Sequence, residues 1–114
     1  ALGRVKFMFP NDYAVYLHDT PAQALFDRAL RAASHGCVRV ADPAALAAFV
    51  LQGDPAWTPA RIQQTLAAGG RVRVDLARPL PVYLVYLTAF ARGGEVDFRD
   101  DIYDRDARLV RALG

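Results

Sequence analysis

The sequence predicts an α/β domain of the α+β type, built as a mixed β-sheet or β-sandwich with peripheral helices. Two kinds of pattern predict it. Short segments alternate apolar and polar residues, which is typical of half-buried strands, and other segments begin and end with residues that start and stop helices. The 114 residues are 54% hydrophobic and contain no low-complexity segment, so a single core is feasible.

The first two strands are predicted to form a hairpin. Residues 4–9 alternate apolar and polar side chains, residues 13–17 are a second apolar stretch, and residues 10–12, Pro-Asn-Asp, are typical of a turn. The hairpin would deliver His18 at its end. A short helix is then expected, on the helical spacing of four apolar residues, Leu25, Phe26, Ala29 and Leu30.

Two helices are predicted at residues 42–53 and 58–68. Each begins with a capping residue followed by proline, Asp42-Pro43 and Thr58-Pro59, and each stops at glycine. The side chains expected to face inward are Leu46, Phe49, Val50, Ile62 and Leu66. Both helices are predicted to be scaffold, and Trp57 is expected to pack between them.

Three strands and a helix are predicted for the remainder. Residues 71–76 alternate with three inward positions, residues 82–89 form a long apolar strand, and residues 95–99 alternate again after a Gly-Gly turn. Tyr83 and Tyr86 are expected on a sheet face. The last helix is expected to end near Leu113 and to be capped by nearby acids, Asp100, Asp101 and Asp104.

The most informative chemistry lies in residues 34–39, Ser-His-Gly-Cys-Val-Arg, which contain the single cysteine of the chain. A thiolate is the reactive form of cysteine, and a histidine can supply the base that generates it. His35 lies two residues before Cys37, and His18 lies upstream with 15 residues between it and Ser34. Gly36 allows the backbone N–H groups to approach a bound carbonyl. These residues predict a cysteine nucleophile.

Three other roles for Cys37 are less well supported by its neighbours. Considered without those neighbours, a lone cysteine is more often a small buried apolar residue than a catalyst. Two histidines and one cysteine provide at most three zinc ligands, without a paired ligand spacing, so no metal is predicted. A disulfide within the chain is excluded because there is only one cysteine.

Arg39 is a candidate for binding a substrate carboxylate. If residues 38–40 are extended, Arg39 points to the same side as Cys37, and a guanidinium binds carboxylates bidentately. The alternative is an exposed ion pair with an acid such as Asp42. Lys6 and Arg31 are further candidates of the same type.

These residues resemble the L,D-transpeptidase catalytic domain of bacterial cell-wall synthesis. The signature of that family is a histidine, a spacer, then Ser or Thr-His-Gly-Cys, an apolar residue and commonly Asn; here Arg39 takes the last place. Similarity to the large periplasmic branch extends over nearly the whole chain, including residues 3–11, 18–21 and the late segment 81–103. Arg at the Asn position is similar to what that branch carries.

The resemblance implies a role for each site residue. Cys37 would be the nucleophile, His18 the general base and His35 a supporting group, while Asp19 would orient His18 through its backbone carbonyl. The backbone N–H groups of Gly36 and Cys37, with help from Tyr16, would stabilise the oxyanion. The residues expected to contact substrate or brace the loop are Arg39, Tyr16 and Ser34.

The resemblance also implies the reaction. Cys37 would attack a tetrapeptide donor stem of peptidoglycan and form a thioester, and an amine of an acceptor stem would then give a cross-link between third residues. No cofactor or metal is implied, and carbapenems are expected to acylate the nucleophile. Water as acceptor would give an L,D-carboxypeptidase, and a noncatalytic wall-binding or structural fragment is the alternative from another class.

Charge and targeting signals are weak. Fourteen basic and 12 acidic residues give a net charge of +2 without a basic cluster, so no nucleic-acid partner is predicted. No signal peptide or membrane-spanning apolar run is present, and the periplasmic or cell-envelope location follows from the resemblance.

Residues 1–114 are predicted to form one L,D-transpeptidase-like catalytic domain that lacks its N-terminal strands. The chain begins at Ala1 without an initiator Met, and domains of this family normally contain further strands before that point. Such a domain would expose sheet edges, so self-association through strand edges is expected.

Overall fold

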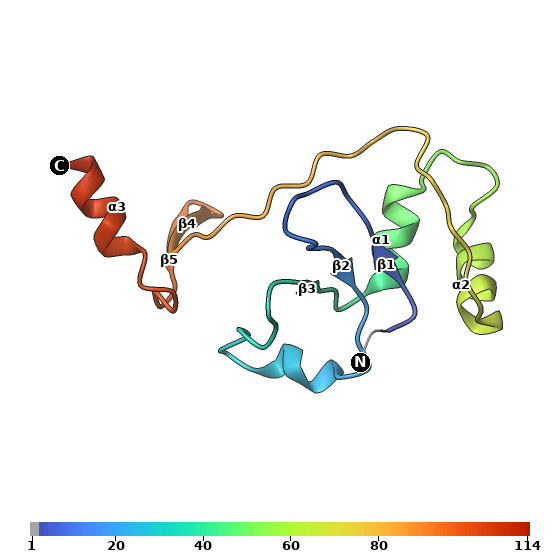
Figure 1. The fold of residues 1–114 in the computed structure, drawn as a ribbon, viewed down its shortest axis with the longest axis horizontal. Helices are drawn as coiled ribbons and strands as arrows, with labels where there is room; N and C mark the ends of the chain where they lie inside the picture. Colours follow the sequence, from blue (N-terminus) through green and yellow to red (C-terminus); the bar gives the residue numbers. More distant parts are fainter. Residues whose placement is uncertain (1–2) are drawn as a thin grey trace. The chain divides into compact units, whose positions relative to one another are not determined.

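The computed structural model describes residues 3–114, which form two compact units, one ending at Pro81 and the other spanning Val82–Gly114. Both units combine helices with short strands (Figure 1). The predicted α+β class is therefore confirmed. The three-stranded sheet and two of the helices belong to the first unit, and a hairpin and the last helix belong to the second.

The sheet of the first unit has the order β1-β2-β3, with β2 in the centre (Figure 1). β1 (Lys6–Phe7) pairs antiparallel with β2 (Leu17–His18), and β2 pairs parallel with β3 (Val38–Arg39). The predicted hairpin that delivers His18 is confirmed, although its strands are shorter than the sequence pattern indicated. Alternate residues from 4 to 9 are exposed and half-buried, as that pattern predicted.

Asn11 organises the loop of this hairpin. Its amide nitrogen donates to the carbonyl oxygens of Phe9 and Val15 at 3.0 and 2.7 Å. Its amide oxygen accepts from the backbone N–H groups of Tyr13 and Val15, each at 3.0 Å. One side chain thus replaces the backbone pairing that the loop lacks, which explains why a turn residue is found here.

The helix predicted after the hairpin is a 3-10 helix, η1 (Gln23–Asp27), and it ends earlier than predicted. Leu25 and Phe26 lie in it, whereas Ala29 and Leu30 lie beyond it. The backbone becomes extended at Arg28, with φ −80° and ψ 142°. Short 3-10 segments are common connectors, and their length limits the helical spacing that they use.

Helices α1 (Pro43–Val50) and α2 (Pro59–Ala68) confirm the two predicted helices. Asp42 and Thr58 are their N-caps. The Asp42 carboxylate accepts from the backbone N–H of Ala45 at 3.0 Å, and the Thr58 hydroxyl accepts from that of Arg61 at 3.2 Å. The inward positions were only partly predicted, because Ile62 is buried but Phe49 is 53% exposed. In α1 the buried side chains are the smaller Pro43 and Ala47.

Residues 71–76 do not form the predicted strand. The segment has no β-ladder, and Val72 is 57% exposed and Leu76 36% exposed. An alternating pattern fits a strand only when a neighbouring strand supplies hydrogen bonds, and the described part of the chain provides none beside this segment. The ion pair between Arg73 and Asp75, at 3.0 Å, is exposed.

In the second unit, the strand predicted at 82–89 is likewise absent over most of its length. Pairing begins at β4 (Ala89–Arg92), which forms an antiparallel hairpin with β5 (Glu95–Phe98). The Gly-Gly turn between them is confirmed, since Gly93 and Gly94 have φ of 59° and 84°. Tyr83, expected on a sheet face, is 82% exposed outside any strand.

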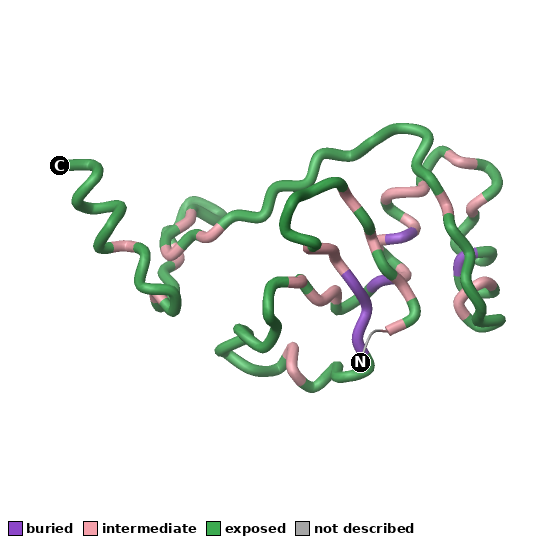
Figure 2. The backbone as a smooth tube through the Cα atoms, viewed as in Figure 1, coloured by how far each residue is buried: buried purple, intermediate pink, exposed green. Residues whose placement is uncertain are grey.

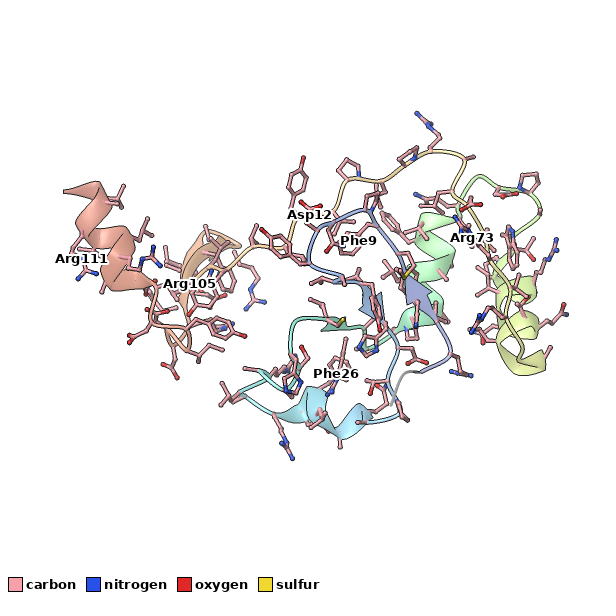
Figure 3. The ribbon with its side chains drawn as sticks, viewed as in Figure 1. Phe9, Asp12, Phe26, Arg73, Arg105 and Arg111 are labelled. Atoms are coloured by element: carbon pink, nitrogen blue, oxygen red, sulfur yellow. The ribbon has the colours of Figure 1, made fainter. Side chains whose placement is uncertain are left out.

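Helix α3 (Asp106–Leu113) confirms the predicted terminal helix, and Asp101 satisfies its first N–H groups. The carboxylate of Asp101 accepts from the backbone N–H groups of Arg105 and Asp106 at 3.0 and 2.7 Å, and from the Tyr86 hydroxyl at 2.5 Å. Thr88 donates to the Asp106 carboxylate at 2.8 Å. Figure 3 shows the Arg105 side chain near the start of α3, where its guanidinium lies over the rings of Tyr86 and Tyr103.

Polar residues make up the longest buried stretch of the described chain. His18, Asp19 and Thr20 are only 6%, 6% and 3% exposed, and this segment begins at the last residue of β2 (Figure 2). The buried apolar residues among those described are Pro43, Ala47 and Ile62. Because buried polar groups are costly unless hydrogen-bonded, the partners of residues 18–20 decide what this segment does.

Candidate active site

The parallel pairing of β2 with β3 brings the predicted base and nucleophile segments together. Leu17 lies opposite Val38 and His18 opposite Arg39. The N–H groups of Val38 and Val40 donate to the carbonyl oxygens of Tyr16 and His18 at 3.3 and 2.9 Å. Cys37 immediately precedes β3, so in this parallel register it lies beside the start of β2, the strand that carries His18.

The side chains of this sheet divide into two faces. Successive residues of a strand point to opposite faces, and paired residues share a face. Lys6, His18 and Arg39 therefore form one row across the three strands, because Lys6 pairs with His18 and His18 with Arg39. Tyr16 lies two residues before His18, and thus on the same face. Three of the predicted site residues, Tyr16, His18 and Arg39, therefore share this face.

The imidazole of His18 is held by the residue that follows it. Its Nδ1 lies 2.6 Å from the backbone carbonyl oxygen of Asp19. A carbonyl oxygen only accepts hydrogen bonds, so Nδ1 carries the proton of the neutral ring and Nε2 is left as the basic nitrogen. The contact predicted between His18 and the backbone carbonyl of Asp19 is therefore present in the structure.

The side chain of Asp19 joins the start of the chain to this segment. One carboxylate oxygen accepts from the backbone N–H of Arg4 at 3.0 Å, and the other accepts from the N–H of Thr20 at 2.7 Å. The Arg4 guanidinium lies 3.7 Å from the same carboxylate. The carbonyl oxygen of Asp19 also accepts from the N–H of Gly3, at 3.0 Å. Asp19 is thus fully used in holding its surroundings.

Ser34 braces the loop that presents the cysteine. Its hydroxyl donates to the carbonyl oxygen of Cys37 at 2.5 Å and accepts from the N–H of Gly36 at 3.3 Å. Gly36 has a φ of +147°, a conformation that side-chain-bearing residues rarely adopt. Cys37 is half-buried with a free thiol, while His35 is exposed. A half-buried thiol in a rigid turn suits a nucleophile that must remain accessible.

Tyr16 lies between a cation and the candidate base. The centroid of its ring is 5.7 Å from that of His18, at an interplanar angle of 57°. On its other side the Lys6 ammonium lies 5.0 Å from the ring centroid. Tyr16 is half-buried, so its ring position is fixed by these neighbours and by its strand.

Arg39 does not form the ion pair with Asp42 that was the alternative role for it. Asp42 instead caps α1, and among the ion pairs of residues 3–114 Arg39 has none. The Arg39 Nη2 donates weakly to the Ala33 carbonyl oxygen at 3.5 Å, and its buried Nε has no partner within the described chain. Arg31, the other candidate, is exposed and donates to the Arg28 carbonyl oxygen at 2.8 Å.

Within residues 3–114, no group of three or more His, Cys, Asp or Glu side chains is arranged to hold a metal ion. The helices in this part of the chain are also too short and too polar for a membrane span.

The sequence patterns did not indicate the parts played by Gly3, Arg4 and Thr20. Their N–H groups contact Asp19, and a Cβ on Gly3 would lie only 2.5 to 2.6 Å from Asp19 atoms. Gly3 and Arg4 begin an alternating segment that predicted only a strand. The sequence feature that could have indicated this contact is Gly3 itself, because glycine is common where two backbones approach closely.

The YkuD family model, described as the L,D-transpeptidase catalytic domain, matches residues 1–62. A protein of Haemophilus influenzae named "Putative L,D-transpeptidase" is 39% identical over 109 residues, which are 96% of this chain and 22% of that protein. The chain therefore spans about a fifth of the length of this relative. The matches include the segment with His18 and Cys37, and they show that the chain belongs to the L,D-transpeptidase catalytic domain family.

Proposed function

We propose that the protein is a peptidoglycan L,D-transpeptidase of the bacterial cell envelope, in the periplasm, and that residues 1–114 belong to one catalytic domain. The observation that carries the proposal is the parallel β2–β3 pairing, which sets the strand of His18 beside the turn of Cys37. Family membership supports the reaction class. The substrates are a tetrapeptide donor stem and an acceptor stem.

Acylation begins with proton transfer from the Cys37 thiol to Nε2 of His18. The thiolate attacks the carbonyl carbon that precedes the terminal residue of the donor stem, and a C–S bond forms. The C–N bond to the leaving amino acid then breaks, and that amine takes the proton from the His18 imidazolium. The product is a thioester on Cys37, and no cofactor or metal takes part.

Deacylation reverses these roles. The amine of an acceptor stem attacks the thioester, and His18 takes the proton that the amine loses. The C–S bond breaks, a new amide joins the third residues of two stems, and the Cys37 thiol is restored. His35, exposed next to the nucleophile, is proposed to support this site.

Oxyanion stabilisation is assigned to the turn before Cys37. The N–H of Gly36 is engaged only by a 3.3 Å contact with Ser34, so a developing oxyanion can compete for it. The Cys37 N–H and the Tyr16 hydroxyl are the other proposed donors. Loss of one such donor costs about a hundredfold to a thousandfold in rate.

Labelling of Cys37 by a carbapenem tests the proposed nucleophile directly. Intact mass spectrometry is expected to show one adduct on the parent protein and none on Cys37→Ser, which keeps the size of the side chain. His18→Gln is expected to slow adduct formation strongly, whereas Arg61→Met on α2 leaves it unchanged. A folded parent that forms no adduct contradicts the enzyme assignment and favours a noncatalytic wall-binding fragment.

The nature of the acceptor separates the transpeptidase from an L,D-carboxypeptidase, since both use the same thioester. Incubation with donor stems, with and without an amine acceptor, is followed by chromatography of the products. A transpeptidase gives cross-linked dimers that increase with acceptor concentration. Tripeptide products alone, at every acceptor concentration, favour the carboxypeptidase.

Self-association through strand edges is also proposed. β1 and β3 are the edges of the three-stranded sheet; Met8, which follows β1, is 71% exposed, and Val38 in β3 is 42% exposed. Light scattering of this chain is expected to show a mass that rises with concentration, and Met8→Lys to reduce it. A constant monomer mass contradicts this proposal.

A further inference from the structure

Two cations flank the proposed base on one face of the sheet. Lys6 lies opposite His18 in the β1–β2 pair, and Arg39 lies opposite His18 in the β2–β3 pair. Paired side chains share a face, so the row runs from cation to imidazole to cation. Adjacent strands are about 4.8 Å apart, which separates the backbones at Lys6 and Arg39 by about 10 Å.

The Lys6 side chain is steered by an aromatic ring. Its ammonium lies 5.0 Å from the centroid of the Tyr16 ring, which in turn contacts the His18 ring. A cation at this distance is attracted by the face of the ring but keeps its hydrogen-bond donors for other partners. Lys6 is exposed, so those donors are accessible to a ligand.

Both cations are free of acidic partners within the described chain. The ion pairs of residues 3–114 involve Arg4, Arg73 and Arg92, but neither Lys6 nor Arg39. The acid that follows His18, Asp19, is occupied by Arg4 and by backbone N–H groups. The face therefore carries positive charge that no described side chain balances.

Lys6 is also chemically unusual in this chain, because it is the single lysine among 14 basic residues. Lysine presents a compact ammonium on a flexible stem, whereas arginine presents a rigid fork. A lysine over the Tyr16 ring can adjust to a carboxylate whose position is set elsewhere. Arg39, by contrast, has its Nε buried, and its Nη2 makes only a weak 3.5 Å contact with the Ala33 carbonyl oxygen.

We propose that Lys6 is a specificity-determining residue that binds a carboxylate of the peptide substrate, on the opposite side of His18 from a carboxylate bound by Arg39. The proposal rests on the proposed function and extends it. The ligand is a peptide that carries two carboxylates, with the reacting carbonyl between them. Charge-assisted hydrogen bonds of this kind discriminate an acid from its amide, because the amide leaves the ammonium without its counter-charge.

The test compares a peptide substrate that has free carboxylates with the same peptide amidated at one carboxylate at a time. For the parent, kcat/KM is expected to be about tenfold higher for the acid than for the amide at the carboxylate read by Lys6. Lys6→Met, which keeps side-chain length, and Lys6→Gln are expected to remove this preference through KM. Lys6→Arg is expected to retain most of it.

Arg61→Met is the matched control. The guanidinium of Arg61, on α2, lies 4.6 Å from the centroid of the Trp57 ring, so the variant also removes one charge and one cation–π contact. It is expected to keep the acid preference. If Lys6→Met lowers kcat/KM equally for the acid and every amide, Lys6 acts only by holding Tyr16, and the proposal is overturned.

Binding measurements separate this proposal from the proposed function. Calorimetry on the Cys37→Ala background, with the same acid and amide peptides, reports recognition without turnover. An acid preference that disappears in the Lys6→Met, Cys37→Ala double variant supports the carboxylate site even if no variant forms a thioester. Normal turnover with an acid preference unaffected by Lys6→Met overturns the site and leaves the transpeptidase assignment intact.

Discussion

The Nδ1 atom of His18 lies 2.6 Å from the carbonyl oxygen of Asp19, and the same oxygen accepts the N–H of Gly3 at 3.0 Å. The backbone of Asp19 therefore sets the tautomer of the imidazole, while its side chain ties the segment to Arg4 and Thr20. A single residue combines orientation of the proposed base with anchoring of the strand end that carries it.

Replacement of Asp19 by alanine is expected to destabilise the protein by about 1 to 3 kcal/mol, because it leaves the N–H groups of Arg4 and Thr20 without an acceptor. The carbonyl contact with His18 remains possible, so the folded variant should keep more acylation activity than His18→Gln. Chemical denaturation measures the stability. Asp75→Ala is the matched control, since its ion pair is exposed and contributes at most about 1 kcal/mol. Equal losses from Asp19→Ala and Asp75→Ala would contradict this account.

Gly3→Ala is expected to reduce acylation of Cys37 much more than a surface substitution would. The new Cβ would lie 2.6 Å from the backbone carbonyl carbon of Asp19, so the backbone that orients His18 must shift. The rate of carbapenem adduct formation, measured on folded protein, reports the shift. Ala45→Ser on the exposed side of α1 serves as a control of similar size. An unchanged adduct rate in Gly3→Ala would show that the close approach is not needed to position the base.

Ser34→Ala is expected to slow acylation by about fivefold to tenfold, the equivalent of one or two modest hydrogen bonds. The hydroxyl joins the Gly36 N–H to the Cys37 carbonyl oxygen, so its loss loosens the turn. Ser34→Thr keeps the hydroxyl and should restore most of the rate. The pH dependence of the rate should be the same in all three proteins, because Ser34 is not proposed to transfer protons. A changed pH profile in Ser34→Ala would mean that the serine takes part in the chemistry.

Local signals in the sequence predicted the local structure. The capping residues Asp42 and Thr58 each act within three residues of themselves, and the helices that they start were correctly placed. The Gly93-Gly94 turn similarly needed no distant partner. Such elements can be predicted because the groups that stabilise them are neighbours in the chain.

Strands that depend on distant partners were predicted poorly. Residues 71–76 and 82–88 have strand patterns, but no described strand pairs with them. The short ladder of β1, β2 and β3 is the converse case, because its register could not be read from the sequence. That register, and not any motif, places Lys6 in a row with His18 and Arg39. The motif indicated the chemistry, whereas the pairing determines which cations accompany it.

The second unit is expected to lose the start of α3 in acid. Hydrogen bonds from the Tyr86 hydroxyl, and then from the Arg105 and Asp106 N–H groups, lower the pKa of Asp101 below its ordinary value of 3.8. A carboxyl with a lowered folded-state pKa stabilises the fold above its ordinary pKa, and this stabilisation is lost as pH falls through the lowered value. Circular dichroism of α3 between pH 6 and about pH 2 should therefore show helix loss below about pH 4.

Tyr86 is expected to limit the stability of the same unit at high pH, and its replacement by phenylalanine is the control for the acid prediction. Burial, followed by the hydrogen bond to Asp101, raises the pKa of Tyr86 above 10.0. Its contribution is present below 10.0 and is lost as pH rises through the raised value, so the unit should also weaken in strong base. Tyr86→Phe removes the first hydrogen bond to Asp101, which brings the carboxyl closer to its ordinary pKa, and helix loss should then begin at a higher pH. If Tyr86→Phe and the parent lose helix at the same pH, the Tyr86–Asp101 contact does not govern the acid stability of this unit.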